Sequence, residues 1–476
     1  MTNKKTVAII VSIGICTFMS ALDSSVINLV IPLIKAEFNV SLSMVAWVVT
    51  GYLLMVSSLL LTYGRVSDLY GQKKINLAGL IIFTAGSVLC GLSRSIGMLI
   101  ACRVVQAVGA GMIFATGPAI ITNAVPAESR GRALSAVAVS VALGVSAGPV
   151  IGGFLATAIG WPSIFFINAP IGIVAIVMVI KNVPDIKPKV EKVRFDILGS
   201  VLVFFALLLI LLPLNISGDY DISAAHFVGL VGAGVLLIAV FIVWELRHAH
   251  PMLDVRIFKN RVFAASNSAA LFAYMAQFIL IFLAPFYLQA LRGFTPSFSG
   301  ILYMSMPLAS MVVAPISGAL SDRVDSRFIS SAGALIMAGG LFMLSFLDIG
   351  TPNAYFIVAM AVTGFGFGFF QTPNNSAIMG NVPAKNRGTA SGTLATMRNI
   401  GMVLGVAVSG ALFEFFSARA TGAYTAAGLV GDVLADKVFV SAIHNTYLVA
   451  VAVALLSMTA SLIKGRVMTE REKSTD

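Results

Sequence analysis

The segment Gly64-Arg-Val-Ser-Asp68-Leu-Tyr-Gly71-Gln-Lys-Lys74 separates two apolar runs of about 20 residues, 43–63 and 75–93. An apolar run of this length crosses the hydrocarbon core of a bilayer as a helix. A short basic connection between two such runs is typical of a cytoplasmic loop. A related connection, Gly318-Ala-Leu-Ser-Asp322-Arg323, follows another apolar run late in the chain. The segment therefore predicts a multi-spanning membrane protein that contains an internal repeat.

Two further pairs of segments repeat in the same order and at nearly the same spacing. The loop 125–131 matches the loop 382–388, and both read Val-Pro-Ala, two further residues, Arg-Gly. Glycines four residues apart in 144–148 recur in 401–405. Because order and orientation are preserved, the repeat is parallel. Two parallel halves around a central cavity form a rocker architecture with a substrate site near the midplane.

The composition is that of a chain buried in lipid. Hydrophobic residues make up 58% of the 476 positions and charged residues 11%, whereas a soluble domain carries roughly 25% charged residues. We therefore predict an all-α integral membrane protein with fourteen transmembrane helices. The predicted spans are 6–31, 43–63, 75–93, 96–122, 133–157, 162–181, 196–216, 226–246, 262–290, 297–318, 328–347, 354–379, 389–416 and 440–463.

The repeat assigns these spans to two six-helix bundles, at 1–190 and 251–476. Two inserted helices, within 191–250, connect the bundles. The net charge of +11 does not indicate nucleic-acid binding, because most Lys and Arg residues lie on alternate connections between apolar runs. This asymmetry places both termini in the cytoplasm of a multi-pass protein of the cell membrane.

The remaining composition excludes several features. The three cysteines fall inside apolar runs, so neither a disulfide nor a metal site is expected. The first run is long enough to span and has no small-residue cleavage site, so no cleavable signal is expected.

Five segments resemble motifs of the major facilitator superfamily, and in particular of its fourteen-span drug:proton antiporter branch. Leu69, Gln72 and Ala107 depart from the family pattern, in which the first two positions are basic and the third is glycine. Together the motifs cover nearly the whole chain. They are the segments 22–32, 64–74, 103–109, 144–153 and 161–172.

The resemblance implies the major facilitator fold and export of lipophilic small molecules, cations among them, in exchange for protons. Protons are then the coupling ion, and no other cofactor is expected. Glycines spaced four apart in one motif predict a tight seam between the halves, and Pro149 bends this helix. The motif that the family associates with antiport comprises Gly144, Gly148, Pro149, Gly152 and Gly153.

Asp23 is an ionisable residue inside the first apolar run, where a charge costs at least ~2.5 kcal/mol on insertion scales. Burial penalises the charged form of a carboxylate, so such a residue is able to bind and release a proton. Asp23 precedes Pro32 by nine residues, and Arg103 follows Arg94 by nine. Both therefore lie about 13 Å below the same membrane surface. We predict that Asp23 and Arg103 form a proton-coupling pair; the alternative is a structural pair that locks two helices together.

Polar residues in the spans are candidates for the wall of a substrate cavity, although each is equally consistent with a hydrogen bond between helices. Arg398 is expected to reach toward lipid headgroups, and Glu414 either attracts a cationic substrate or reaches the interface. Aromatic residues, Tyr274 and Phe367 among them, are further candidates for the wall. The polar candidates are Asn28, Gln106, Gln277, Gln371, Asn374 and Asn375.

The repeated connections are candidates for a conformational latch. Asp68 lies in the loop after the second run, and Arg130 and Arg132 lie in the next loop on the same side, before the fifth run, so ion pairing or helix capping would hold one conformation. The alternative is a solvated turn whose charges only orient the protein. The predicted latch residues are Gly64, Asp68, Gly71, Arg130, Arg132, Asp322 and Arg323.

The same residues bear on other classes of function. An exporter of a lipid, siderophore or other metabolite on the same fold stays open as the alternative. A channel is disfavoured by the six-plus-six repeat, and a membrane-embedded enzyme by histidines that lack ligand spacing. No Walker A sequence is present, so ATP-driven pumping is not supported. We expect a monomer whose partners are a small molecule and the bilayer.

Overall fold

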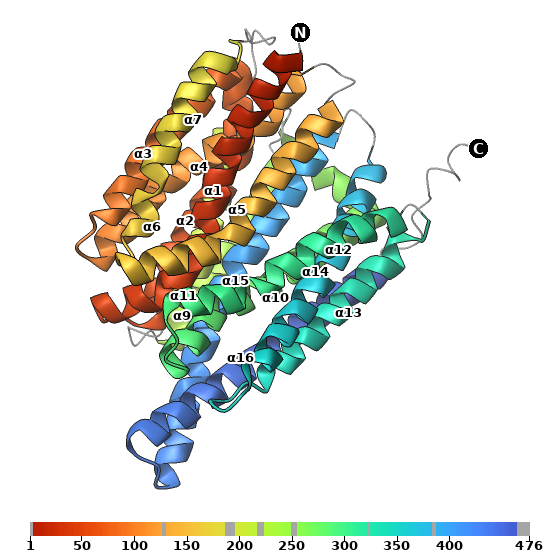
Figure 1. The fold of residues 1–476 in the computed structure, drawn as a ribbon. Coiled ribbons are helices and arrows are strands. Elements are labelled where there is room, and N and C mark those ends of the chain that lie inside the picture. Colours follow the sequence, from red (N-terminus) through yellow and green to blue (C-terminus); the bar gives the residue numbers. More distant parts are fainter. Residues whose placement is uncertain are drawn as a thin grey trace.

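The computed structural model describes residues 3–125, 130–185, 196–216, 223–248, 255–321, 323–382 and 387–463, and throughout these residues the regular structure is helical (Figure 1). Thirteen helices of this part are long and apolar enough to cross a membrane, and the apolar stretch Leu198–Pro213 is a shorter one. Each of the fourteen predicted spans corresponds to one of these segments. The all-α membrane class is therefore confirmed.

The first bundle contains six spans, of which the sixth is interrupted. α1 packs against α5, α7 and α4, and α3 packs against α4 and α7. The span helices are α1 (Asn3–Phe38), α2 (Leu42–Tyr70), α3 (Gln72–Gly91), α4 (Ile96–Ala124), α5 (Arg130–Ala158) and the pair α6 (Ser163–Phe166) and α7 (Asn168–Asn182).

The second bundle repeats this packing. α10 packs against α15 and α16 as α1 does against α5 and α7, and α13 packs against α14 as α3 does against α4. The helices are α10 (Arg261–Phe286) with the π-helix η3 (Tyr287–Leu291), α11 (Pro296–Tyr303) with α12 (Ser305–Ser321), α13 (Ser326–Ser345), α14 (Asn353–Gly380), α15 (Arg387–Ala426) and α16 (Gly431–Ile463). The short 3₁₀ helix η2 (Val255–Lys259) precedes α10.

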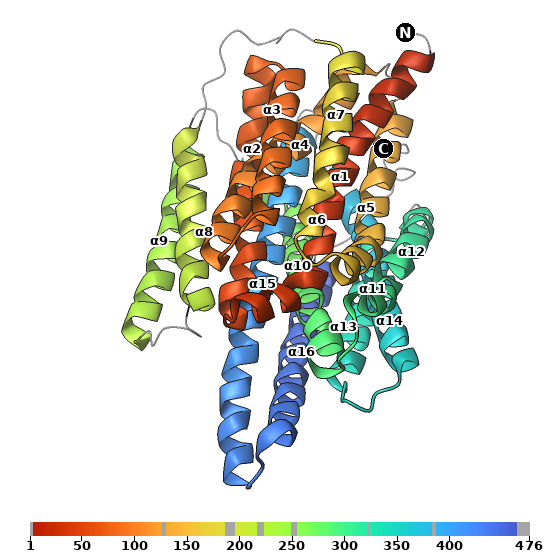
Figure 2. The same cartoon turned by 60° about the vertical axis from the view of Figure 1, so that its left-hand side comes forward.

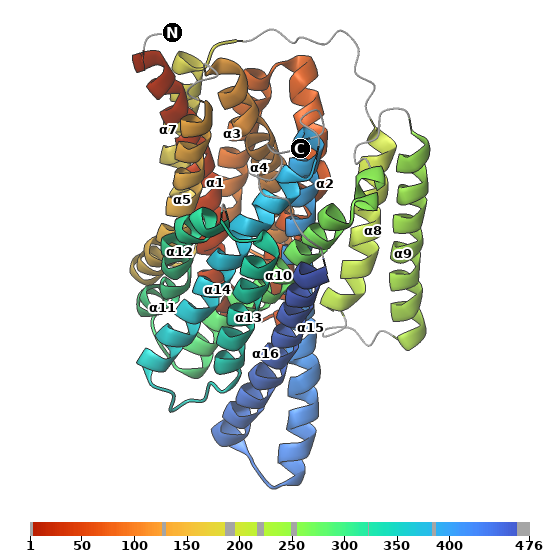
Figure 3. The same ribbon diagram turned by 90° about the vertical axis from the view of Figure 1, so that its right-hand side faces the viewer.

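The two inserted helices lie beside the bundles and not between them. α8 (Ile197–Ile216) and α9 (Ala224–Arg247) pack on each other, and α8 contacts α2 and α15 (Figures 2 and 3). The hydroxyls of Thr62 and Ser200 are 2.6 Å apart across the α2–α8 contact. The insertion therefore covers the side of the molecule where α2 meets the second bundle.

Several helix boundaries differ from the sequence expectation. α2 continues as a helix to Tyr70, so the segment from Gly64 is helical and the turn is confined to Gly71. Gly71 has φ +96°, a conformation that glycine adopts without strain. At the other end of the molecule, α15 continues to Ala426 and α16 already begins at Gly431. The two helices form a hairpin that projects beyond the bundles (Figure 1). The apolar runs stop short of these helix ends because charged residues, Asp68, Arg419 and Lys437 among them, interrupt the apolar positions.

The two halves are joined by hydrogen bonds at one end of the molecule. We call the end where α1 begins and α2 meets α3 the basic end, and the other the opposite end. At the opposite end Glu414 of α15 accepts bonds from the backbone N–H and the hydroxyl of Ser43, at 2.9 and 2.5 Å. The side-chain amide of Gln289 donates to Leu29 O at 2.7 Å. The halves are therefore held together where α1 ends and α2 begins.

A second contact between the halves, of α5 with α11, depends on glycines. A Cβ added at Gly300 would lie 2.1 Å from Pro149 O, and one at Gly153 would lie 2.3 Å from Pro296 O. The Ser297 hydroxyl donates to Gly153 O at 3.0 Å. Only close backbone approach allows these contacts, so no larger residue fits here without a shift.

The remaining glycines of this motif do not form the seam that we expected between the halves. A Cβ at Gly144 would lie 2.7 Å from Phe18 O, and Cβ atoms at Gly148 and Gly152 would meet Ser25 and Val26. These three glycines instead bring α5 against α1 of the same bundle. Only Pro149 and Gly153 reach the other half.

We predict that Gly300→Ala opens the opposite end. The added Cβ cannot coexist with Pro149 O, and overpacking of this kind costs about 1–3 kcal/mol. The measurement is the oxidative cross-linking yield of Thr157→Cys with Ser297→Cys, whose hydroxyls are 2.8 Å apart, in a variant without native cysteines. The yield is expected to fall severalfold. Gly339→Ala is the matched control, because its Cβ would meet nothing within 4 Å; equal yields in both variants would contradict the prediction.

Candidate functional site

Asp23 of α1 and Arg103 of α4 form an ion pair inside the first bundle. Arg103 Nη1 lies 2.7 Å from Asp23 Oδ2, and the two side chains are 1% and 2% exposed. It is the single salt bridge among the residues that the structure describes. The two residues at equal predicted depth are thus brought together, and as a unit the pair is electrically neutral.

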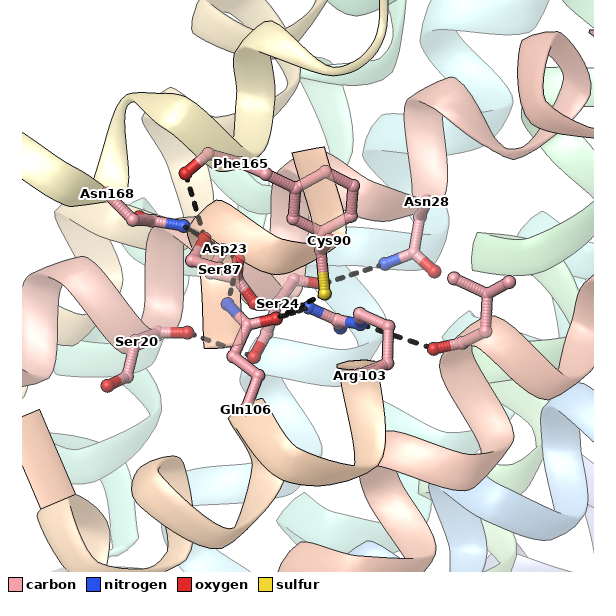
Figure 4. Close-up of polar contacts among 11 residues, drawn as sticks. Ser20, Asp23, Ser24, Asn28, Ser87, Cys90, Arg103, Gln106, Phe165 and Asn168 are labelled. Carbon is pink, nitrogen blue, oxygen red and sulfur yellow. Dashed lines mark hydrogen bonds and ion pairs between the residues drawn. The ribbon is translucent and has the colours of Figure 1, made fainter. Parts of the chain in front are cut away.

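Two amide side chains complete the shell of the Asp23 carboxylate (Figure 4). Gln106 Nε2 donates to Asp23 Oδ1 at 2.9 Å, and Asn168 Nδ2 donates to the same oxygen at 2.8 Å. Arg103 Nη1 also donates to Gln106 Oε1 at 2.8 Å. The carboxylate therefore has a partner on both oxygens, supplied by α4 and α7.

The guanidinium of Arg103 is fixed on its other sides by α2 and by aromatic rings. Arg103 Nε donates to Val48 O at 3.3 Å. The guanidinium carbon lies 4.1 Å from the centre of the Tyr52 ring and 5.7 Å from that of Phe165. A cation held over an aromatic face is stabilised by the ring quadrupole. Contacts from α1, α2, α4 and α7 thus converge on one buried pair.

Close packing of α3 against α4 brings Ser87 to this network. A Cβ at Gly86 would lie 2.8 Å from the Cα of Gln106, so only glycine lets α3 approach α4 here. Ser87 accepts from Asn168 Nδ2 at 2.9 Å and donates to Phe165 O at 2.8 Å. Asn168 and Ser87 were not assigned a role from sequence. Asn168 lay within a quoted motif as a polar residue in an apolar run, which is the signal that could have identified it.

The other polar candidates lie in different surroundings. Asn28 is buried and donates to Ser24 O of its own helix. Asn374 is buried and donates to Ser266 O of α10, which is a contact between helices. Gln277 is 6% exposed in α10, and Asn375 is partly exposed in α14. Whether any of them contacts substrate stays a prediction.

A second group of side chains gathers in the other bundle. The guanidinium carbon of Arg398 lies 4.8 Å from the centre of the Tyr274 ring. Tyr274 meets Phe367 edge to face, with ring centres 5.0 Å apart, and its hydroxyl accepts from Gln371 at 2.7 Å. Arg398 therefore contacts an aromatic ring, whereas the sequence predicted a contact with lipid headgroups.

The predicted latch is described only in part. Gly64 is helical, Gly71 forms the turn, and Arg132 and Arg323 are exposed. Asp322, and the side chains of Asp68 and Arg130, lie outside the described residues. The latch therefore stays a prediction.

Two six-helix bundles of repeated packing, with a buried charged pair in one and an arginine within a span of the other, define a multi-spanning membrane transporter. The profile of the family described as the Major Facilitator Superfamily matches residues 13–406 and 267–463. The chain belongs to this family.

Relatives and solved structures support this assignment. The chain is 36% identical to the riboflavin transporter RibZ of Clostridioides difficile, over 87% of this chain and 89% of that one. It is 29% identical to the multidrug resistance protein Stp of Mycobacterium tuberculosis, over 86% and 76%. A bacterial homologue of the human lysosomal transporter Spinster, solved in an inward-facing and unoccupied conformation, has the same fold, with a TM-score of 0.71, 16% identity and coverage of 98% of each chain. The resemblance to drug-type transporters of the superfamily is thus confirmed.

We predict that the charges of Asp23 and Arg103 are strongly coupled in stability. Asp23→Asn or Arg103→Gln alone leaves an uncompensated buried charge, which costs about 3–5 kcal/mol of unfolding free energy. The double variant removes both charges and is expected to cost less than the sum of the two. Chemical unfolding of the purified protein in detergent measures all three. Arg419→Gln, at an exposed position of α15, is the control for loss of one positive charge, and strict additivity of the two single variants would refute the coupling.

Proposed function

We propose that this protein is a proton-coupled secondary transporter that exports lipophilic small molecules in exchange for protons, by alternating access of the two bundles. The observation that carries the proposal is the Asp23–Arg103 pair, buried to 1–2% exposure within membrane spans. Ionisable residues in this position are costly and generally mark ion pathways. We place the basic end and both termini in the cytoplasm, and we expect a monomer.

The contacts of the pair supply a route from proton binding to conformational change. Protonation of Asp23 would weaken its attraction for Arg103, because the pair would lose its opposite charges. Arg103 also bonds Val48 O of α2, five residues from Ser43, which is bonded to Glu414 of the other half. A shift at the pair therefore acts on the helix that carries a contact between the halves.

The first helix supplies a parallel route. Asp23 lies on α1, and six residues farther Leu29 O accepts the bond from Gln289 of the second bundle. Val26, between them, packs against Gly152 of α5, and α5 contacts α11 through Gly153. The contact of Leu29 with Gln289 thus lies within two helical turns of Asp23 on α1. The contact of α5 with α11 lies on a helix that packs against α1. Bistable packing of this kind converts small shifts into movement of whole domains.

A metabolite exporter is the second candidate. The relative at 36% identity, RibZ, is a riboflavin transporter, whereas Stp is a multidrug resistance protein and MdtP from Bacillus subtilis a multidrug transporter. A transport panel that includes riboflavin distinguishes the two.

We predict that Asp23→Asn abolishes coupling to protons and leaves binding of substrate intact. In proteoliposomes with an imposed pH gradient, the wild type is expected to accumulate at least one compound among riboflavin, fluorescein, rhodamine 123 and ethidium. Asp23→Asn should lower gradient-driven accumulation by about tenfold or more, a typical coupling energy. The measurement is accumulated fluorescence with and without an ionophore that collapses the gradient.

Two further variants keep the test decisive. Asp23→Asn with Arg103→Gln has no uncompensated charge, so it separates loss of coupling from loss of folding. Asp432→Asn removes an exposed carboxylate at the start of α16 and should transport as the wild type does. Undiminished gradient-driven transport by a folded Asp23→Asn variant would move the coupling site elsewhere.

A further inference from the structure

The second bundle holds an arginine whose charge no described acidic residue balances. Arg398 lies on α15, one face of which packs on α10: Cβ atoms at Gly401 and Gly405 would approach Leu271 O and Met275 O to 2.4 and 2.6 Å. Residues 398, 401 and 405 share this face because a helix repeats every 3.6 residues. Arg398 is therefore directed toward α10 and its Tyr274.

The position of Arg398 along its helix excludes a simple headgroup contact. It lies about 16 Å along the helix axis from Arg387 at the basic end. Tyr274 lies about 20 Å from the start of α10 by the same measure. Both are therefore near the middle of a hydrocarbon layer that is about 30 Å thick.

The two bundles differ in whether the arginine within their spans is neutralised by an acidic residue. Arg103 is neutralised by Asp23 at 2.7 Å, and this is the single salt bridge of the described residues. Glu414, on the same helix as Arg398, is about 24 Å farther along it and is bonded to Ser43. In the described residues Arg398 thus keeps its full positive charge within the span.

The neighbours of Arg398 leave it able to bind an anion. Its guanidinium carbon lies 4.8 Å from the centre of the Tyr274 ring, and its side chain also hydrogen-bonds Tyr274, but a guanidinium carries five N–H donors and so has more than this contact uses. Arg398 and Gln371 are partly exposed, whereas Tyr274 and Phe367, whose rings are in contact beside them, are 4% and 6% exposed. A planar donor fork beside aromatic rings fits a carboxylate on an aromatic scaffold.

We propose that Arg398, Tyr274, Phe367 and Gln371 form the substrate-recognition site, and that this site takes planar aromatic organic anions. The proposal rests on the transport function above and names its substrate class. The guanidinium of Arg398 binds the acidic group, the aromatic rings pack against the scaffold, and Gln371 bonds a polar edge. A cationic substrate would meet the charge of Arg398 in a medium of low dielectric constant, where repulsion is strong.

The test is equilibrium binding of two fluorescent probes that share the xanthene ring and differ in charge: fluorescein, an anion, and rhodamine 123, a cation. Anisotropy titration of the purified full-length protein at fixed pH gives both affinities without any proton gradient. The wild type is expected to bind fluorescein at least about tenfold more tightly than rhodamine 123. Tighter binding of rhodamine 123 by the wild type would overturn the proposal.

Variants on one helix assign the preference to Arg398. Arg398→Gln should weaken fluorescein binding about tenfold or more and leave rhodamine 123 unchanged or tighter. Arg398→Lys retains the charge without the planar fork and should keep part of the preference. Arg419→Gln removes an equal charge from an exposed position of α15 and should keep all of it. An unchanged probe ratio in a monodisperse Arg398→Gln variant would overturn the proposal.

The two proposals fail separately. If the Asp23→Asn variant loses gradient-driven transport but still prefers fluorescein to rhodamine 123, both proposals are supported. Undiminished coupling in Asp23→Asn with an Arg398-dependent anion preference refutes only the role of Asp23. Coupling that depends on Asp23 without any anion preference refutes only the substrate class.

Discussion

The carboxylate of Asp23 and the guanidinium of Arg103 lie where neither water nor lipid headgroups supply hydrogen bonds, so protein groups must satisfy them. This requirement orders a large part of the first bundle. Gln106 and Asn168 bond the carboxylate, and Val48 O accepts from the guanidinium. Four helices are thereby fixed around one ion pair, and a change of its charge alters hydrogen bonds to all four.

The same bundle meets its partner through backbone contacts that allow little adjustment. Gly153 and Gly300 bring α5 and α11 within backbone contact of each other, and Glu414 bonds the first residues of α2. Because packed interfaces switch between discrete arrangements and do not deform continuously, these contacts are either made or broken. We therefore propose that the network around Asp23 and the close contacts at the opposite end move together in alternating access.

The fold was largely predictable from sequence, because lipid imposes one rule on every span: about 20 apolar residues in a helix. The pairing of Asp23 with Arg103 followed from equal depth in the first and fourth runs of the same half. Contacts between helices were not predictable in this way. Sequence placed the glycines of α5 between the halves, whereas Gly144 and Gly148 pack against α1. The direction of Arg398 was missed for the same reason, since depth says nothing about which face of a helix a side chain occupies.

The positions of these charges also bear on how proton binding and substrate binding are coupled. Direct competition requires both to bind one group, but the carboxylate of Asp23 is enclosed in the first bundle and bonded on both oxygens. The unbalanced charge of Arg398 lies in the second bundle, beside Tyr274. Under the two proposals above, a proton on Asp23 and an anion on Arg398 would interact through the contacts between the halves, and not by exclusion from a shared site. Coupling of this kind is a difference in the stability of two packings, which explains why glycine contacts far from either charge belong to the mechanism that we propose.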